Sequence, residues 1–475
     1  MRFLFIIITV ALVYPINGQT CNCESNFAWV KKTFEENDAG FQYIIDKKVQ
    51  SAYNIHNQLM LGKVESAKTF MECEKLLYEW LTFFRSGHIG IERLVNTSTQ
   101  QNVSQTPNAT GTYETWEVDI PQFEKYISTK KEADYEGIWD LGGIYKIGIK
   151  KDGVNYIGFI IESDVDGWRE PGQVKLKIEQ DGIELKSTFF MRDHSSVESG
   201  EPELVGDNHL EINGQLLKRL SPVFPKDPFV DHYYKAMYSQ NPFLEELNET
   251  TLYLRIPTFD PGHKSAIDKV IADNKDRILK TKNLIIDLRY NGGGGDASYA
   301  ELLPFLYTNP VRTLGVELLS TTQNNQLYLD YTKRYELYEE TQRRIKETYD
   351  KLQGREGEFV RTSDESVSIK RSDIIYEYPK NVGIIINKGN GSTAEQFLFA
   401  AKQSKKVKLF GVTTAGALDI SNMIFIESPC KEFELGYCMS RSLRIPDIGL
   451  QPDYFLDKTI PQYKWIEFVN DILNH

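Results

Sequence analysis

The chain has 475 residues, of which 41% are hydrophobic and 26% are charged, and its formal net charge is −12. This composition is typical of a folded globular protein with about two to four domains and excludes a low-complexity or collagen-like chain. The acidic charge argues against non-specific binding to nucleic acid, which needs a basic surface.

The N-terminal segment has the pattern of an export signal. Arg2 precedes an apolar run from Phe3 to Tyr14 that is too short to span a bilayer, and Gly18 is a small residue suited to cleavage. The alternative is an N-terminal membrane anchor, but no second apolar segment supports it. We therefore predict a signal peptide at residues 1–18, a secreted or periplasmic mature protein, and no membrane-spanning segment after it.

The five cysteines are consistent with export, because oxidising compartments favour disulfides. Cys430 and Cys438 bracket a predicted hairpin and are candidates for a bridge, while Cys73 is a candidate to pair with Cys21 or Cys23. The sequence lacks a Cys-x-x-Cys pair, a zinc-like cysteine and histidine spacing and a His-Glu-x-x-His motif. It therefore predicts no metal site and no cofactor.

Two regions precede the last half of the chain. Helical periodicity from about Cys23 to Arg85 predicts a small helical cap within residues 19–95. A polar segment rich in Ser, Thr and Asn, residues 96–112, predicts a surface loop. From Tyr113 to Leu220, strand-like runs alternate with Asp/Gly turns, so we predict a β-rich module at residues 96–220.

Residues 221–475 alternate strands with helices, which is typical of an α/β domain with mostly parallel strands. The predicted strands are 252–256, 284–288, 382–386 and 407–411, and the predicted helices are 266–279, 297–306 and 396–403. The charged segment 328–354 predicts a solvated helix or helical hairpin.

A serine lies at the turn between the strand 382–386 and the helix that follows it. In Gly391-Ser392-Thr393-Ala394-Glu395, a nucleophile and the backbone N–H groups of a helix N-terminus share one turn. Ser-x-x-Glu before an apolar run is also the capping-box pattern, in which Ser392 and Glu395 only satisfy the free N–H groups of the helix. The turn alone is compatible with both interpretations.

A glycine loop is the second signal. Asp287-Leu288-Arg289-Tyr290-Asn291 is followed by four glycines and Asp296, and such a run costs conformational entropy unless the backbone needs unusual dihedrals or a close approach. An oxyanion-binding loop and a flexible loop both fit, whereas the two common phosphate-binding patterns do not. An ion pair between Asp287 and Arg289 would fix the turn.

A serine nucleophile needs a base, and His88 is the candidate. It follows a predicted helix end, where a structural histidine would also fit, and Ser86 beside it is a candidate to orient the ring. A carboxylate near the C-terminus, Asp447 or Asp453, is a candidate to support the imidazole, although aspartates also cap turns.

Together these segments resemble the tail-specific, or C-terminal-processing, serine peptidases. D-L-R-x-N-G-G-G, the serine turn, G-x-x-T-x-G from Gly411 and G-L-x-P-D from Gly449 occur in the family's order over about residues 250–455, with S-G-H-I-G-I at 86–91 upstream. The resemblance implies an endopeptidase acting on peptides or proteins. It also implies a crotonase/ClpP-like spiral of ββα units with an N-terminal helical cap. The β-rich module would occupy the position of a PDZ domain, although it lacks the PDZ carboxylate-binding glycine loop.

One departure from the family pattern indicates which branch of the family the chain resembles. The processing peptidases use a Ser–Lys dyad, and Ala417 stands at the position of that lysine. The chain is similar instead to the tricorn core domain and the interphotoreceptor retinoid-binding protein repeats, whose base is an upstream histidine. The resemblance then implies the following residues: nucleophile Ser392, base His88, its carboxylate Asp447, oxyanion donors Gly293 and Thr393, and supporting residues Glu395 and Ser86. Two alternatives are an inactive binder of an apolar or peptide ligand on the same fold and a scaffold protein that functions through its β-rich module.

Overall fold

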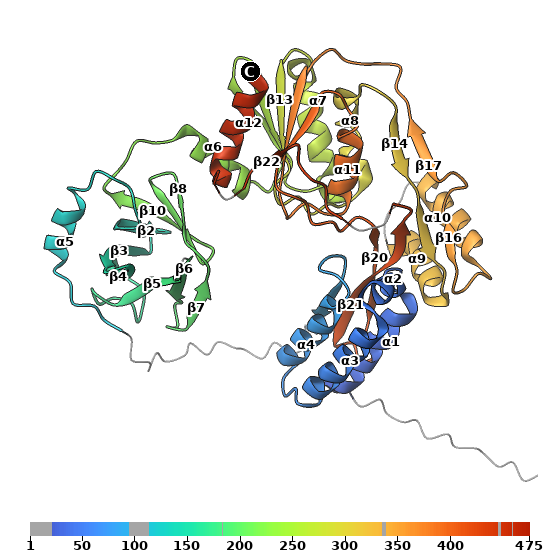
Figure 1. Ribbon diagram of the computed structural model, residues 1–475, viewed down its shortest axis with the longest axis horizontal. Helices are drawn as coiled ribbons and strands as arrows, with labels where there is room; N and C mark the ends of the chain where they lie inside the picture. The colour runs from blue at the N-terminus through green and yellow to red at the C-terminus, as the bar shows by residue number, and fades with distance from the viewer. Residues whose placement is uncertain (1–20, 95–113, 183, 335–338, 445–447, 458) are drawn as a thin grey trace, which may run out of the picture.

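The computed structural model describes residues 21–94, 114–182, 184–334, 339–444, 448–457 and 459–475 (Figure 1). The predicted signal peptide and the whole of the polar loop 96–112 lie outside the described residues. No helix in the part of the chain that is described combines the length and apolar composition needed to cross a membrane.

The N-terminal region is helical, as predicted. Its apolar side chains pack around Trp80 and against the strands that follow, and capping side chains from Asn22 and Thr69 begin the first and last of its helices. The helices are α1 (Cys23–Asn37), α2 (Phe41–Lys48), α3 (Gln50–Glu65) and α4 (Phe70–Thr82).

A five-stranded antiparallel sheet packs against these helices. Its long β20–β21 hairpin lies beside them in Figure 1, and β21 also pairs with the strand that follows α4. The strands are β1 (Gly90–Arg93), β15 (Val316–Leu319), β16 (Phe359–Arg361), β20 (Ile420–Glu427) and β21 (Phe433–Ser442). The charged segment forms the predicted helical hairpin, α9 (Thr322–Arg334) and α10 (Glu339–Leu352), and buries Leu352 against the same core.

Two disulfides anchor the start of the described chain. Cys21 is bonded to Cys430, and Cys23 is bonded to Cys73. The predicted bridge between Cys430 and Cys438 is therefore wrong, because Cys430 is used by a partner 409 residues away in the sequence. Disulfides of this kind are consistent with an extracytoplasmic protein.

The β-rich module is one antiparallel sheet of nine strands, ordered β7-β6-β5-β4-β3-β2-β10-β9-β8. Its hydrophobic core contains Trp139 and Trp168. Its elements are α5 (Ile120–Ile127), β2 (Gly137–Leu141), β3 (Tyr145–Asp152), β4 (Asn155–Ser163), β5 (Val174–Asp181), β6 (Glu184–Phe190), β7 (Ser196–Ser199), β8 (Glu203–Val205), β9 (His209–Ile212) and β10 (Gln215–Ser221).

Lys175 of β5 is an unusual member of this core because its side chain is 1% exposed. Its Nζ lies 3.8 Å from the ring centroid of Trp168 and 4.3 Å from that of Tyr145, and no carboxylate pairs with it among the described residues. Burial lowers the pKa of Lys175 to about 7. The aromatic faces offset only part of the cost of burying its charge.

We expect Lys175→Met to stabilise the protein at pH 7 by about 1–3 kcal/mol, because it removes a buried charge and keeps the volume. The lysine has a lower pKa in the folded than in the unfolded state, so wild-type stability rises between pH 7 and 10 as the unfolded chain also loses this proton. The advantage of Lys175→Met, measured by urea unfolding, is therefore expected to shrink from pH 7 to pH 9.5. An advantage that is absent at pH 7 or does not change with pH would contradict this account.

The C-terminal half contains a six-stranded sheet of order β11-β12-β13-β18-β19-β22, in which every pair except β11–β12 is parallel. This arrangement confirms the predicted α/β class. The strands are β11 (Phe243–Asn248), β12 (Thr251–Arg255), β13 (Asn283–Asp287), β18 (Asn381–Ile386), β19 (Val407–Gly411) and β22 (Tyr454–Phe455).

Helices cover both faces of this sheet, because its central strands are apolar on both sides. On one face lie α7 (Lys264–Ile278), α8 (Leu303–Leu306) and α11 (Thr393–Ala401), and on the other lie α6 (Pro228–Tyr238) and α12 (Trp465–Asn474) (Figure 1). The predicted helix 297–306 is instead a 3₁₀ turn, Asp296–Tyr299, followed by α8. A separate two-stranded antiparallel sheet of β14 (Val311–Leu314) and β17 (Val367–Lys370) lies beside α11.

Candidate active site

Ser392 lies at the carboxyl end of the sheet, in the turn from β18 to α11. Its backbone has φ 53° and ψ −126°, a conformation that costs a non-glycine residue on the order of 1–3 kcal/mol. Its side chain is half-buried and makes no capping hydrogen bond to α11. The capping-box interpretation is therefore wrong, because the Ser392 hydroxyl does not satisfy an N–H group of the helix.

Glu395 binds a neighbouring loop instead of the N-terminus of its own helix. Its buried carboxylate accepts the Thr414 hydroxyl and the N–H groups of Gly416 and Ala417, at 2.7 and 2.8 Å for the two amides. Burial raises the pKa of Glu395, and these donors oppose that rise. Glu395 thereby fixes the loop that follows β19 against the serine turn.

Ala417 is where the serine and histidine segments meet. A Cβ added to Gly87 would lie 3.0 Å from the Cβ of Ala417, and one added to Gly391 would lie 3.6 Å from the same atom. Gly87 precedes His88, and Gly391 precedes Ser392. The structure therefore brings the segments of Ser392 and His88 against the same residue, although they lie far apart in the chain.

The His88 ring is held by a backbone carbonyl. Its Nδ1 lies 2.6 Å from the carbonyl oxygen of Ile420, three residues after Ala417. Because a carbonyl oxygen can only accept, Nδ1 carries the proton and Nε2 keeps its lone pair. Burial lowers the pKa of His88, the hydrogen bond to Ile420 opposes this, and the charge of Arg85 adds to the lowering, so the net direction favours the neutral ring.

Arg85 fixes the backbone of the histidine. Its guanidinium donates to the carbonyl oxygen of His88 at 2.9 Å and forms a buried ion pair with Asp38 of the helical cap. The thiol of Cys438 lies 3.4 Å from the same carbonyl oxygen. The helical cap and β21 thus hold the backbone of His88 in place, through Arg85 and Cys438.

Ser392 and His88 do not form a hydrogen bond among the described residues, although their segments share Ala417. Asp447 lies outside the described residues, and the place expected for its carboxylate at Nδ1 is taken by the Ile420 carbonyl. Asp453 binds β19, where its Oδ2 accepts the N–H of Leu409 at 2.8 Å, and no hydrogen bond joins it to His88 among the described residues. Ser86 is exposed beside Gly87.

The glycine loop packs directly on the serine turn. Gly293 has φ 109°, and a Cβ there would lie 2.8 Å from the amide nitrogen of Thr393 and 2.9 Å from the Cβ of Ser392. Glycine is therefore required at this position by both the backbone conformation and the close approach. The Thr393 hydroxyl donates to the carbonyl oxygen of Gly294 at 2.8 Å and joins the two loops.

The two backbone amides expected in an oxyanion site differ in whether their N–H groups already donate a hydrogen bond. The N–H of Thr393, in the first turn of α11, donates to no other group among the described residues. The N–H of Gly293 donates to the Asn291 side chain at 3.0 Å and is engaged. Asn390 fixes this neighbourhood, since its side chain donates to the carbonyl oxygen of Asn291 at 3.1 Å.

The expected ion pair at the start of the glycine loop is confirmed. Arg289 Nη2 lies 2.6 Å from Asp287 Oδ2, and both side chains are fully buried. Tyr253 also donates to Asp287, at 2.7 Å. Burial alone would raise the pKa of Asp287, but the charges of Arg289 and Arg255 outweigh it and lower the pKa to about 2. The loop is thus fixed at its base and is not freely flexible there.

We expect Asp287→Asn to destabilise the protein by about 3–5 kcal/mol, because it leaves the Arg289 charge buried without its carboxylate. The free energy of unfolding in urea measures this loss, with Asp276→Asn on the exposed side of α7 as the matched control. Equal stability of the two variants would show that Asp287 does not fix the loop.

Comparison with known proteins places this site in context. Residues 250–436 match the sequence model described as peptidase family S41, while no curated protein matches the chain. The solved structure of mature CPAF with lactacystin is similar at 11% identity and a TM-score of 0.52, over 95% of this chain and 97% of that chain. At this identity the likeness shows a shared fold alone.

Two further solved structures are similar at lower scores. The photosystem II D1 C-terminal processing protease has 10% identity and a TM-score of 0.36, over 96% of this chain and 98% of that chain. The tricorn protease has 11% identity and a TM-score of 0.40, over 95% of this chain and 36% of that chain.

Proposed function

Because the chain belongs to peptidase family S41, the tail-specific and C-terminal-processing serine peptidases, we propose that it is an endopeptidase with Ser392 as nucleophile and His88 as general base. The observation that carries the proposal is the meeting of Gly87 and Gly391 on Ala417, with the Nδ1 proton of His88 held by Ile420. Ala417 stands where the processing peptidases have their catalytic lysine, and its small side chain leaves room for His88 to act as the base.

The mechanism follows from these positions. His88 Nε2 accepts the Ser392 proton as the hydroxyl attacks the scissile carbonyl, and later returns it to the leaving amine. The imidazolium that forms is stabilised by the Ile420 carbonyl at Nδ1, with Asp447 as a further proposed support. The Ser–His hydrogen bond forms when substrate binds, since such bonds are often long before that stage.

The oxyanion site is proposed to combine the amides of Thr393 and Gly293. The Thr393 amide is ready to donate, whereas the Gly293 amide must first leave the Asn291 side chain. Losing one such donor typically costs about 10²–10³ in kcat. Glu395 supports the site by holding the loop that carries Ala417.

The domain organisation is proposed on the same basis. We assign residues 1–18 to a signal peptide, 19–95 to the helical cap, 96–220 to the β-rich module at the PDZ position, and 221–475 to a catalytic domain with a crotonase/ClpP-like spiral. The disulfides favour a secreted or periplasmic location.

A direct experiment is to incubate the purified mature protein with an unfolded, reduced protein such as casein and to identify the products by mass spectrometry. We expect internal cleavage that produces new N- and C-termini. Intact casein, together with saturable binding of an apolar fluorophore by the folded protein, would favour the inactive binder.

The pH dependence of hydrolysis tests the base. We expect kcat/KM to rise with pH along a one-proton limb whose midpoint lies below 6.5, because only neutral His88 accepts the serine proton and burial lowers its pKa. Thermal unfolding over the same pH range separates this limb from acid denaturation. A midpoint above 7, or activity that is flat from pH 5 to 8, would contradict the assignment.

A further inference from the structure

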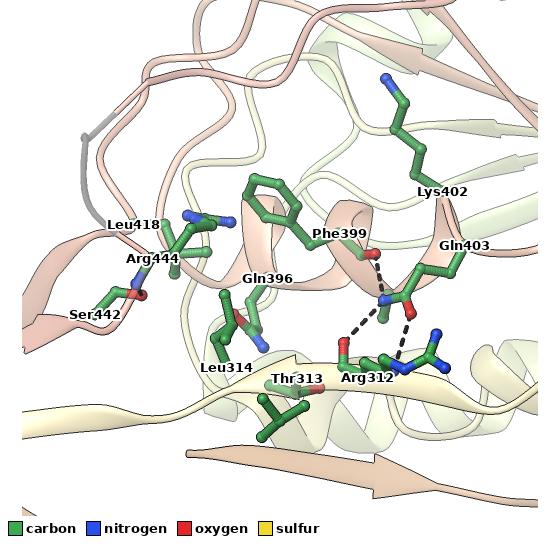
Figure 2. Close-up of a pocket in the computed structure, with 12 residues that line it drawn as sticks. Arg312, Thr313, Leu314, Gln396, Phe399, Lys402, Gln403, Leu418, Ser442 and Arg444 are labelled. Atoms are coloured by element: carbon green, nitrogen blue, oxygen red, sulfur yellow. Dashed lines mark hydrogen bonds between the residues drawn. The ribbon is translucent and has the colours of Figure 1, made fainter.

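A cavity of about 490 Å³ lies between α11 and β14 (Figure 2). Leu418, the residue after Ala417, is part of its lining, and Ala417 is the residue on which the serine and histidine segments meet. α11 lines it with Gln396, Phe399 and Ala400, which share one helix face, and Gln403 in the turn after α11 adds to the lining. Ser392 is the N-cap residue of α11 and precedes Gln396 by four residues, so its backbone lies about one helical turn before the cavity. The cavity is thus positioned to receive a part of the substrate near the bond that is cut.

The edge of β14 faces this cavity. Gln403 accepts the Arg312 N–H at 2.9 Å and donates to the Arg312 carbonyl oxygen at 2.9 Å, so that its side-chain amide pairs with one residue of the strand (Figure 2). The Arg312 backbone therefore points away from β17. In an antiparallel pair, the backbone N–H and carbonyl groups of successive residues face opposite sides of the strand. Those of Thr313 therefore face β17, and those of Leu314 face α11, as those of Arg312 do. The N–H and carbonyl of Leu314 are thus directed to the side where an extended peptide would pair.

The lining defines the side chain that fits. Most of its contact surface is apolar, and its charged members are cations without a carboxylate among the lining residues. The apolar members are Leu314, Val367, Phe399, Ala400 and Leu418, and the cationic members are Arg312, Lys402 and Arg444. Arg444 is already paired with Asp419 at 2.8 Å and lies over the Phe399 ring, so it closes the cavity without offering a free charge.

We propose that this cavity is a specificity subsite that holds an apolar side chain of an extended substrate strand paired with Leu314, and that it excludes lysine and arginine. The proposal rests on the proposed function, because it takes Ser392 as the point of cleavage. A basic side chain would bring its charge among like charges with no partner, which is the kind of repulsion that sets specificity.

Capped alanine octapeptides test the proposal, each with one Leu, Glu or Lys substituted at successive positions. We expect kcat/KM for Leu to exceed that for Lys by at least about tenfold at one position near the scissile bond. Leu314→Glu places a carboxylate in the cavity from an exposed position and is expected to lower this Leu/Lys ratio about tenfold. Leu59→Glu, at an exposed leucine of α3, is the matched control and should leave the ratio unchanged.

Binding to Ser392→Ala separates this inference from the proposed function. With fluorescently labelled octapeptides, anisotropy should give the same ranking, Leu above Lys, without any cleavage. Failure of wild-type hydrolysis with the ranking intact would overturn the catalytic proposal and leave the subsite. Equal binding of Leu and Lys peptides, a preference for Glu, or no change in the ratio with Leu314→Glu would overturn the subsite.

Discussion

Ser392→Ala is expected to reduce kcat by about 10⁶-fold while the protein stays folded. Loss of a serine nucleophile has an effect of this size, because the other catalytic groups then have nothing to activate. The fold should tolerate the change, since the Ser392 side chain makes no capping hydrogen bond to α11. Single-turnover hydrolysis of a cleavable peptide and far-UV circular dichroism measure the two effects.

Ser392→Gly provides a sharper control for the same residue. Glycine adopts φ 53° without the steric cost of a Cβ, so we expect this variant to be more stable than Ser392→Ala by about 1 kcal/mol and equally inactive. The two variants would then differ in stability and be equally inactive, which separates the loss of activity from any change in stability. Activity at the wild-type level in either variant would exclude Ser392 as the nucleophile.

His88→Ala has the second largest expected effect, a loss of about 10⁴–10⁶ in kcat with little change in binding of the substrate. The reason is that removal of the base leaves the serine protonated at neutral pH. His232→Ala is the matched control, because the Nδ1–H of His232 also donates to an oxygen, Glu245 Oε1 at 2.6 Å, but His232 lies on α6. Full activity of His88→Ala would assign the base to another group.

Much of the fold was predictable because its signals are local. Alternating apolar residues and Asp/Gly turns identified β3, β4 and β5, and the apolar runs ending at Leu288 and Ile386 identified the parallel strands. The segment around Pro304 carries apolar residues at helix-like spacing, yet the structure forms a 3₁₀ turn and the four-residue helix α8 there. Local periodicity does not reveal such an interruption.

The candidate site was predictable only in part. Ser392 and the glycine loop have sequence signals, but Glu395 resembled a capping residue and in fact binds the loop at Gly416 and Ala417. Ile420 gives no signal, because it acts through its backbone carbonyl. Cys21 pairs with Cys430, which lies 409 residues away in the sequence, and such a contact depends on the whole fold.

Labelling with a fluorophosphonate tests the central assignment most directly. We expect one phosphonyl adduct per chain, mapped by mass spectrometry to Ser392, and at least about a thousandfold slower labelling in His88→Ala, because the probe reacts with a serine activated by its base. An adduct on another residue in an active protein, or labelling of Ser392 that is equally fast without His88, would contradict the Ser392–His88 mechanism.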